Sequence, residues 1–357
     1  MLDILVTGGC GFVGSNAALG LARRKGFRVT VLDNLKRRGS ELNLPYLARA
    51  GVRFVHGDIR SRADLESVDR CDLILECSAE PSVHAGYGHS PEYLVQTNLL
   101  GTINCLEYAR GKKNALIFLS TSRVYPVKSL NTLALAQKDT RLDFCGEGIP
   151  GCSEKGISED FPLKGSRSLY GTTKLASEML IEEYGAMYGL PYLINRCGVI
   201  AGPRQMGKVD QGFVSLWLAR HYWEKPLSYI GYGGRGLQVR DILHVRDLVD
   251  LLCLQIDDFS RLRGNTWNVG GGRANSVSLL ELTEMCRELT GKRVEPASTP
   301  ETSPADIPWY ITDNTKICAD SGWRPERPVR VLLEDTYEWL QAHARELQPF
   351  FTEAGAD

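Results

Sequence analysis

The first 33 residues contain the feature that most restricts how this chain can fold. An apolar run at 2–7 is followed by the turn GGCGFVG at 8–14, and then by a helical pattern that ends at Gly26. A second strand pattern at 28–33 ends in Asp33. Strand, glycine-rich turn, helix and strand in this order predict a βαβ unit, and hence a doubly wound parallel sheet with helices on both faces.

Three glycines in this turn have the spacing that suits a dinucleotide. Gly8, Gly11 and Gly14 let the backbone approach a pyrophosphate, which binds the amide groups at a helix N-terminus. Asp33 lies 19 residues after Gly14, where a carboxylate can accept hydrogen bonds from both ribose hydroxyls of NAD. A basic trio at 36–38 could meet the 2′-phosphate of NADP, but Asp33 would repel that phosphate, so the sequence favours NAD. The alternatives are a turn that binds nothing and a solvated basic loop.

A third strand pattern at 52–56 leads into Asp58. Its carboxylate could accept a hydrogen bond from the adenine amino group. Alternatively, Asp58 could cap the N-terminus of the helix predicted from ADLESV at 63–68.

Composition excludes several classes of protein. The chain has 357 residues, of which 43% are hydrophobic and 24% charged, which rules out a disordered chain, a collagen-like repeat and a coiled coil. Its formal net charge of −1 gives no electrostatic case for binding nucleic acid or a membrane surface. No run of 18 apolar residues and no signal-peptide pattern is visible, so we expect no membrane span and a cytoplasmic location.

The ten cysteines indicate neither a metal site nor a disulfide framework. No two of them have CxxC spacing, and no His accompanies them at the spacing of metal ligands. Most lie in apolar stretches, where a cysteine behaves as a small buried hydrophobe. We therefore expect no bound metal and free thiols, which are typical of a reducing cytoplasm.

A second group of candidate functional residues lies further along the chain. The run ALIFLSTS at 115–122 predicts a strand that is apolar until its hydroxyl-rich end, at the sheet edge where ligands bind. Tyr170 and Lys174 stand at i and i+4 of a predicted helix, on one face. An ammonium lowers the pKa of a nearby phenol, so Tyr170 could act as a general base while Thr121 orients the reacting hydroxyl. Alone, such a Tyr and Lys could equally be a helix-surface pair.

Together, these motifs resemble the extended short-chain dehydrogenase/reductase family. The resemblance rests on TGGCGFVG at 7–14, HGDIR at 56–60 and the Tyr170-x-x-x-Lys174 pair, and it extends over essentially the whole chain. Within that family the chain resembles the nucleotide-sugar epimerases, and most closely the CDP-paratose 2-epimerases (CDP-tyvelose epimerases). The stretches that suggest this are STSRVYP at 120–126, GPRQMGKVDQGF at 202–213, QVRDILHVRDL at 238–248 and the long segment between Tyr125 and Tyr170.

The resemblance implies a reaction without loss of water. The related 4,6-dehydratases carry an Asp-Glu pair directly after the catalytic Thr, where this chain has Ser122 and Arg123. For a 2-epimerase, Tyr170 would take the C2 hydroxyl proton, and a 2-keto sugar would turn over and be reduced on its other face, with NAD tightly bound throughout. The alternatives are a 4-epimerase or reductase of the same fold and a non-catalytic nucleotide-binding sensor.

The resemblance also implies a set of site residues. The catalytic residues would be Thr121, Tyr170 and Lys174. NAD would meet Gly8, Gly11, Phe12, Val13, Gly14, Asp33, Asn34, Asp58, Ile59, Ser78, Ala79, Asn98, Tyr170 and Lys174. The CDP-linked sugar would meet Ser122, Arg123, Asn195, Arg204, Gln205, Gln211, Gly212, Tyr229, Gln238, Arg240 and Asp306, with Arg204 and Arg240 as guanidinium ligands of the diphosphate.

Two positions depart from what the resemblance leads us to expect. Most relatives carry His at the place of Glu76, which ends a buried strand pattern and needs partners there. Glu76 could support the site from behind or mark a subgroup, and the sequence leaves both open. In the late loop, Ile307 and Pro308 replace the Gln and Arg that are usual in the family.

The strand and helix patterns predict one sheet with a lobe formed from the second half of the chain. We expect a Rossmann-type NAD-binding domain at 1–196 plus 237–270, a smaller α/β substrate-binding lobe at 197–236 plus 271–345, and a polar tail at 346–357. The resemblance implies a homodimer or homotetramer formed through the helices that begin near Asn98 and Tyr170.

Overall fold

The computed structural model describes residues 1–69, 71–209 and 211–352. Its contacts divide the chain into two units, each of which is formed by several separate stretches of sequence. Unit 1 comprises Met1–Val124, Ser168–Cys197 and Val249–Trp267, and unit 2 comprises Tyr125–Arg167, Gly198–Leu248 and Asn268–Asp357. The chain therefore leaves unit 1 three times and returns to it twice.

Unit 1 is built on a seven-stranded sheet with the order β14-β10-β5-β4-β1-β2-β3. Its strands are β1 (Leu2–Thr7), β2 (Phe27–Asp33), β3 (Arg53–His56), β4 (Leu73–Glu76), β5 (Ala115–Thr121), β10 (Tyr192–Cys197) and β14 (Asn265–Val269). The pairs from β3 through to β10 are parallel. Because β2 lies on one side of β1 and β4 on the other, the strand order reverses at β1, and ligands bind beyond the carboxyl ends of strands at such a point. The predicted Rossmann-type sheet is confirmed.

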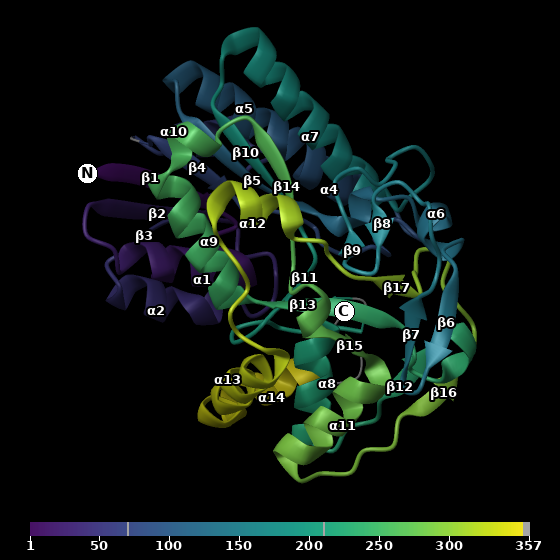
Figure 1. The fold of residues 1–357 in the computed structure, drawn as a ribbon. Coiled ribbons are helices and arrows are strands. Elements are labelled where there is room, and N and C mark those ends of the chain that lie inside the picture. Colours follow the sequence, from purple (N-terminus) through teal and green to yellow (C-terminus); the bar gives the residue numbers. More distant parts are fainter. Residues whose placement is uncertain (70, 210, 353–357) are drawn as a thin grey trace. The chain divides into compact units, whose positions relative to one another are not determined.

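Helices cover both faces of this sheet (Figure 1). On one face α1 (Phe12–Ala22) packs against β1 and β2, and on the other α5 (Gly101–Lys112) and α7 (Leu169–Tyr188) pack against β4, β5 and β10. The shorter elements are η1 (Ser40–Asn43), α2 (Leu44–Arg49), α3 (Arg62–Glu66), α4 (Glu92–Val95), the π-helical turn η2 (Gln96–Leu100), the 3-10 turn η3 (Ser122–Val124) and α10 (Phe259–Leu262). Helix α9 (Val245–Asp257) crosses from unit 2 into unit 1.

The core under α5 and α7 explains why β4, β5 and β10 are continuously apolar. Ile74, Leu116, Phe118 and Ile194 are all fully buried in one hydrophobic cluster. Burying a side chain of this size stabilises a fold by about 1.5–3 kcal/mol, so a few such positions fix the sheet against its helices.

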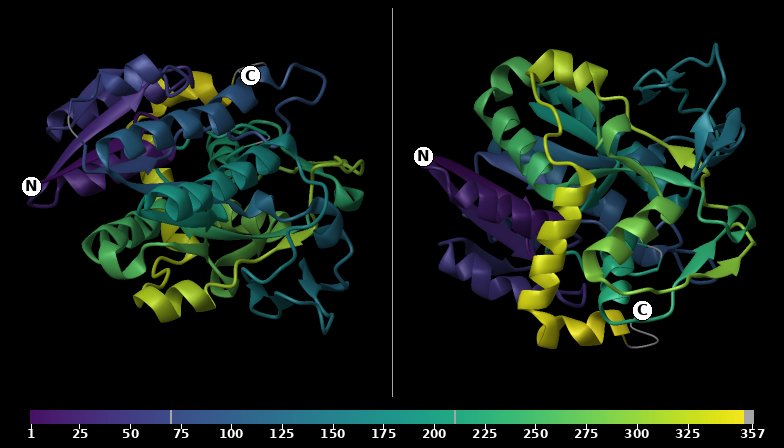
Figure 2. Two further views of the ribbon diagram at one scale, coloured as in Figure 1. Left: turned by 90° about the horizontal axis from the view of Figure 1, so that it is seen from above. Right: turned by 60° about the horizontal axis from the view of Figure 1, so that its bottom comes forward.

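Unit 2 has its own small sheet, with β13 (Val239–His244) as its central strand. β13 pairs in parallel with β11 (Val199–Ala201) and β17 (Trp309–Tyr310) and antiparallel with β15 (Ser276–Ser278). Helix α8 (Phe213–Tyr222) packs against α11 (Leu279–Thr290), α13 (Val329–Ala342) and α14 (Ala344–Thr352). Figure 2 shows α13 and α14 in yellow, with the turn of the chain between them. The remaining elements are α6 (Val127–Asn131), β12 (Ser228–Ile230) paired with β16 (Ala297–Thr299), η4 (Tyr232–Gly234), η5 (Arg273–Asn275) and α12 (Thr315–Ser321).

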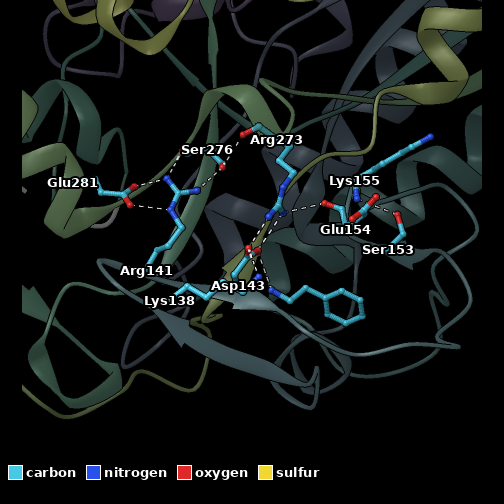
Figure 3. A network of polar contacts seen from close by, with 10 residues as sticks. Lys138, Arg141, Asp143, Ser153, Glu154, Lys155, Arg273, Ser276 and Glu281 are labelled. Atoms are coloured by element: carbon cyan, nitrogen blue, oxygen red, sulfur yellow. Dashed lines mark hydrogen bonds and ion pairs between the residues drawn. The ribbon is translucent and has the colours of Figure 1, made fainter.

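The long segment between Tyr125 and Tyr170 contains two short hairpins in unit 2, β6 (Leu135–Lys138) with β7 (Arg141–Phe144) and β8 (Cys152–Ser153) with β9 (Gly156–Ile157). Ion pairs tie the first hairpin to the rest of the unit (Figure 3). The Arg141 guanidinium binds Glu281 and Ser276, and the Arg273 guanidinium binds Asp143 and the Glu154 carbonyl. These contacts explain why the segment folds with unit 2.

The boundaries of the units differ from those predicted. Residues 125–167 were expected in the NAD-binding domain, but their ion-pair partners place them in unit 2. The return to the first domain was predicted at 237–270, whereas 249–267 makes that return, because β13 pairs within the small sheet. The predicted tail from 346 is helical as far as Thr352, with Leu347 and Phe351 buried.

Among the described residues, no helix combines the length and the apolar character that crossing a membrane requires.

Candidate active site

The turn between β1 and α1 needs glycine at positions 8, 9 and 14. Gly8 has a φ of +64°. A Cβ on Gly14 would lie 2.2 Å from the Gly8 carbonyl oxygen, and one on Gly9 would lie 2.4 Å from the Cβ of Val31. The turn therefore packs tightly against itself and the sheet, and it brings the N-terminus of α1 to the carboxyl end of β1. The first amides of α1 have no acceptor within the helix, so the predicted cradle for a pyrophosphate fits this geometry.

Asp33 stands at the end of β2 and is held by the same turn. Its carboxylate accepts hydrogen bonds from the Cys10 amide at 2.9 Å and from the Leu35 amide at 2.8 Å. Burial raises the pKa of Asp33, while these backbone hydrogen bonds oppose the shift. A carboxylate fixed at this strand end fits the predicted contact with the ribose hydroxyls of NAD.

Asp58 lies beyond β3 and joins two other polar side chains. The Asn34 amide donates to its carboxylate at 2.8 Å, and Arg60 donates at 2.7 Å. Burial alone would raise the pKa of Asp58, but the hydrogen bonds from Arg60 and Asn34 hold it at about 2. The alternative role as a helix cap is wrong, because Ser61 caps α3 by accepting the Asp64 amide. The adenine contact of Asp58 and Asn34 stays a prediction.

Two predicted cofactor contacts have other uses in the structure. The Asn98 side chain accepts the Glu80 amide at 2.7 Å and donates to the Glu80 carbonyl at 3.0 Å, so it fixes the loop after β4. The Ile59 side chain is buried in the hydrophobic cluster of unit 1, which leaves only its main chain to meet a cofactor. Ser78 and Ala79 begin the loop that Asn98 holds, and Gly8 packs closely against the Ser78 main chain.

The structure brings the predicted catalytic residues together at the carboxyl end of β5. Helix α7 is capped by the Ser168 hydroxyl, which accepts the Gly171 amide at 3.2 Å and thereby fixes the first turn that carries Tyr170. The Thr121 hydroxyl is hydrogen-bonded to the Tyr170 hydroxyl, which favours the phenolate. Burial nevertheless raises the pKa of Tyr170 to about 12.

Lys174 lies one turn further along α7 and is only 2% exposed. Its Nζ atom stands 4.1 Å from the centroid of the Phe118 ring, a cation–π distance. Burial lowers the pKa of Lys174, and the Glu76 carboxylate opposes that shift. A buried ammonium on the same helix face as Tyr170 is the arrangement that the motif predicts.

The sequence does not reveal a buried ion pair that lies beneath helix α7. Arg196 at the end of β10 donates to the Glu178 carboxylate from both Nε and Nη2, at 3.0 and 2.7 Å. Ser120, directly before Thr121, donates to the same carboxylate. The position of Glu178 one turn after Lys174 is the only sequence signal, and it does not reveal a partner on a distant strand. The pair fixes α7 against β5 and β10.

Ser122 and Arg123 follow Thr121 in the 3-10 turn η3. The Arg123 charge acts on Tyr170 and lowers its pKa, while the Glu80 charge raises it. The group beside Tyr170 at this position is therefore a cation, which cannot protonate a leaving hydroxyl.

Several predicted substrate ligands are occupied by protein partners. The Asn195 amide exchanges two hydrogen bonds of 2.8 Å with Gln255 in the core of unit 1, so its predicted sugar contact is wrong. The Gln205 side chain in unit 2 donates to the Ile200 carbonyl and accepts from Ser215, which fixes the loop before α8. The side-chain amides of Asn195 and Gln205 therefore stabilise the fold.

Arg240 and Asp306 lie together in unit 2. The Arg240 guanidinium donates to the Asp306 carboxylate at 3.0 Å and to the Ile307 carbonyl at 2.6 Å.

The other predicted substrate ligands of unit 2 also contact protein groups or shape its loops. Tyr229 stacks on Trp217 and donates to Thr283, and Gln238 donates to the Ile230 carbonyl. Gln211 and Gly212 precede α8, where Gly212 has a φ of +75°. Arg204 also has a positive φ, +75°. The substrate contacts of these residues stay predictions.

Comparisons with known proteins agree with this geometry. The model of the NAD dependent epimerase/dehydratase family matches residues 4–270. The chain is 30% identical to a CDP-paratose 2-epimerase of Salmonella typhi over 357 aligned residues, which cover 96% of this chain and 100% of the relative. A UDP-glucose 4-epimerase of Thermotoga maritima, solved with UDP-glucose, is 26% identical with a TM-score of 0.78, covering 96% of this chain and 100% of that one. A Thermus thermophilus UDP-glucose 4-epimerase, solved with NAD, is 27% identical with a TM-score of 0.76, covering 95% and 99%.

Proposed function

The chain belongs to the NAD-dependent epimerase/dehydratase family, and we propose that it inverts C2 of a CDP-linked hexose of the paratose and tyvelose type. The observation that carries this proposal is the group formed by Thr121, Tyr170 and Lys174. Ser122 and Arg123, which directly follow Thr121, stand where the dehydratases carry an acid pair. A base without an adjacent acid supports oxidation and reduction of the sugar ring rather than elimination of water. The likeness to the Salmonella typhi CDP-paratose 2-epimerase supports CDP as the nucleotide and C2 as the reacting carbon.

Each catalytic residue then has a distinct task. Tyr170 takes the proton of the C2 hydroxyl when the hydroxyl is oxidised, and returns a proton when the ketone is reduced. Thr121, hydrogen-bonded to Tyr170, orients the same hydroxyl and favours the phenolate. Lys174 favours the phenolate through its charge. When bound, NAD would supply the hydride chemistry, as the acceptor when the sugar is oxidised and the donor when it is reduced.

This chemistry predicts tight binding of the cofactor, because NAD ends each turnover in its starting state. The glycine turn and Asp33 are its proposed ligands, as their geometry fits a dinucleotide. Arg204 and Arg240 are the proposed ligands of the diphosphate. Arg240 would exchange its contact with Asp306 for the phosphate, since both are anionic partners of the same guanidinium.

The proposed reaction is tested on purified protein in two steps. The protein is denatured and the released cofactor is identified by mass spectrometry, for which we expect NAD. The intact enzyme is then incubated in D2O with CDP-, UDP-, ADP- and GDP-linked hexoses. We expect inversion at C2 of a CDP-hexose with no solvent deuterium at C2, because the returned hydride comes from the same carbon. Deuterium at C2 would contradict the mechanism.

The same incubation distinguishes the other functions of this fold. Inversion at C4 would replace the proposal by a 4-epimerase, as the Thermotoga and Thermus relatives are named. Consumption of the cofactor in proportion to substrate would indicate a reductase. Binding without turnover of any of these sugars would indicate a nucleotide sensor.

We also infer a homodimer in a reducing compartment. Helix α7 exposes Met179 and Met187 at 61% and 67%, and η2, which leads into α5, exposes Leu100 at 47%. Apolar side chains therefore lie exposed on the helices that are expected to pair. Sedimentation velocity should give a mass of at least twice 39.6 kDa, and a monomer at micromolar concentration would contradict this inference. All ten cysteines are free, which supports a cytoplasmic location.

A further inference from the structure

Glu76 is a carboxylate at the carboxyl end of β4 that is 0% exposed. It pairs in register with Thr7 of β1 and with Phe118 of β5. Side chains of register partners on neighbouring strands lie on the same face of a sheet. The Glu76 carboxylate therefore lies on the same face as the Phe118 ring.

The Phe118 ring is also the neighbour of Lys174, whose Nζ atom lies 4.1 Å from the ring centroid. Glu76 and Lys174 thus approach the same aromatic ring from a strand and a helix. Burial raises the pKa of Glu76 and lowers the pKa of Lys174, and the attraction between the two charges is the strongest influence opposing each shift. Each group favours the charged form of the other.

Hydrogen bonds hold the Glu76 carboxylate on one side. The Thr102 hydroxyl donates to Oε1 at 2.6 Å, and the Cys105 thiol also bonds to the carboxylate. Oε2 is buried and receives no hydrogen bond from any residue that the structure describes. A buried carboxylate oxygen without a donor is costly unless an opposite charge compensates it.

The other titratable groups that face Lys174 act on it less strongly than Glu76. Burial raises the pKa values of the Cys77 and Cys197 thiols far above neutrality, so both are uncharged. The Glu178 charge also favours the Lys174 ammonium, but less than Glu76 does, and Glu178 is paired with Arg196. Glu76 faces only uncharged groups besides Lys174, since burial also keeps the Cys105 thiol protonated.

We propose that Glu76 is a positioning residue that keeps Lys174 in its ammonium form beneath the catalytic tyrosine. The inference rests on the proposed function in one respect, namely that Tyr170 acts as the base with Lys174 one turn away on α7. Without the carboxylate, the buried ammonium would lose its proton more readily. A neutral Lys174 would leave the helix face that carries Tyr170 without this positive charge.

The test is Glu76→Gln, which removes the charge and keeps the shape. The alkaline limb of the pH profile of kcat/KM should move to lower pH, because Lys174 loses its proton at a lower pH without the carboxylate. An opposite charge at this range shifts a pKa by about one unit or more, so we expect about a tenfold or greater loss of activity on that limb. The ionisation of Lys174 is also followed without substrate, by NMR of 15N-lysine-labelled protein in which a Lys174→Met variant identifies its signal. It should move to lower pH in Glu76→Gln.

Three further variants make the result specific. Glu76→Asp keeps a carboxylate and should restore part of the pH range. Glu76→Leu removes the charge and puts no new polar group in the core, and it decides the question if Glu76→Gln does not fold. Ser177→Ala is the matched control, because Ser177 is a fully buried, uncharged neighbour of the site whose hydroxyl donates to the Asn98 and Thr173 carbonyls. It should lower stability slightly and leave the pH profile in place.

Two outcomes overturn the proposal. One is a folded Glu76→Gln or Glu76→Leu protein with the parent pH profile and the parent Lys174 titration. The other is an equal shift in Ser177→Ala, which would show that any disturbance of the core has this effect. The lysine titration separates this inference from the proposed function. A shifted titration in a protein that inverts no CDP-hexose would refute the function alone, and an unshifted titration in an active 2-epimerase would refute the inference alone.

Discussion

Replacing Tyr170 with Phe should lower kcat by about 10²- to 10⁴-fold, the range that general-base catalysis contributes. Phenylalanine keeps the ring and its packing but has no hydroxyl to take the sugar proton. The loss should be in kcat and kcat/KM alike, because the hydroxyl acts on the reacting group rather than on binding. The measurement is steady-state C2 inversion, accompanied by the NAD content and the Tm of the variant.

The matched control for this substitution lies on the same helix. Tyr184 also belongs to α7, and its hydroxyl donates to Glu107 at 2.7 Å. Tyr184→Phe makes the same chemical change away from the site and should cost about 1 kcal/mol of stability with no change in kcat. A Tyr170→Phe enzyme as active as the parent would show that the base is another group or that the chain is not this catalyst.

Local motifs let the sequence predict the parts of the site that one stretch of chain builds. The glycine turn and Asp33 belong to a single βαβ unit, so their order along the chain fixes their geometry. Tyr170 and Lys174 are one helical turn apart. The hydroxyl-rich end of β5 follows from a strand that is apolar up to that point. Predicting these features required only a correct assignment of helices and strands.

The predictions failed where a side chain's partner is distant in sequence. Asn195 ends a strand in a region that the resemblance assigns to the site, yet its partner is Gln255, which is 60 residues away on another element. Arg240 is a diphosphate candidate by residue type, and that contact stays a prediction, but the sequence did not reveal that a loop 66 residues later supplies Asp306 as its partner. Residue spacing carries no information on such pairs, and the same reason hid the Arg273 contact that draws residues 125–167 into unit 2.

The sequence raised the question of Glu76 without deciding it. A carboxylate in a buried strand predicted that partners exist, but neither Thr102 nor Lys174 could be chosen from spacing alone. The register of β4 and β5 supplies the answer, because it sets Glu76 beside the ring that Lys174 contacts. Departures from a family pattern at buried polar positions therefore gain meaning once the sheet register is known.

Replacing Gly14 with Ala should abolish stable NAD binding. The added Cβ would lie 2.2 Å from the Gly8 carbonyl oxygen and 2.8 Å from the Gly9 Cα. These are backbone atoms, so the clash can be relieved only by moving α1 away from the turn that it shares with the pyrophosphate site. We expect purified Gly14→Ala protein to release little or no NAD on denaturation. Overpacking of this kind costs about 1–3 kcal/mol, so its Tm should fall by several degrees.

The control for Gly14→Ala is the same substitution in a helix of the same unit that has room for it. A Cβ on Gly111 of α5 would meet nothing within 4 Å. Gly111→Ala should therefore keep its NAD and gain about 0.4–1 kcal/mol, because alanine restricts the unfolded chain. If Gly14→Ala protein retained one NAD per chain and the parent Tm, the close contact between α1 and the glycine turn would not be what holds the cofactor. The dinucleotide would then depend chiefly on Asp33 and the strand ends around it.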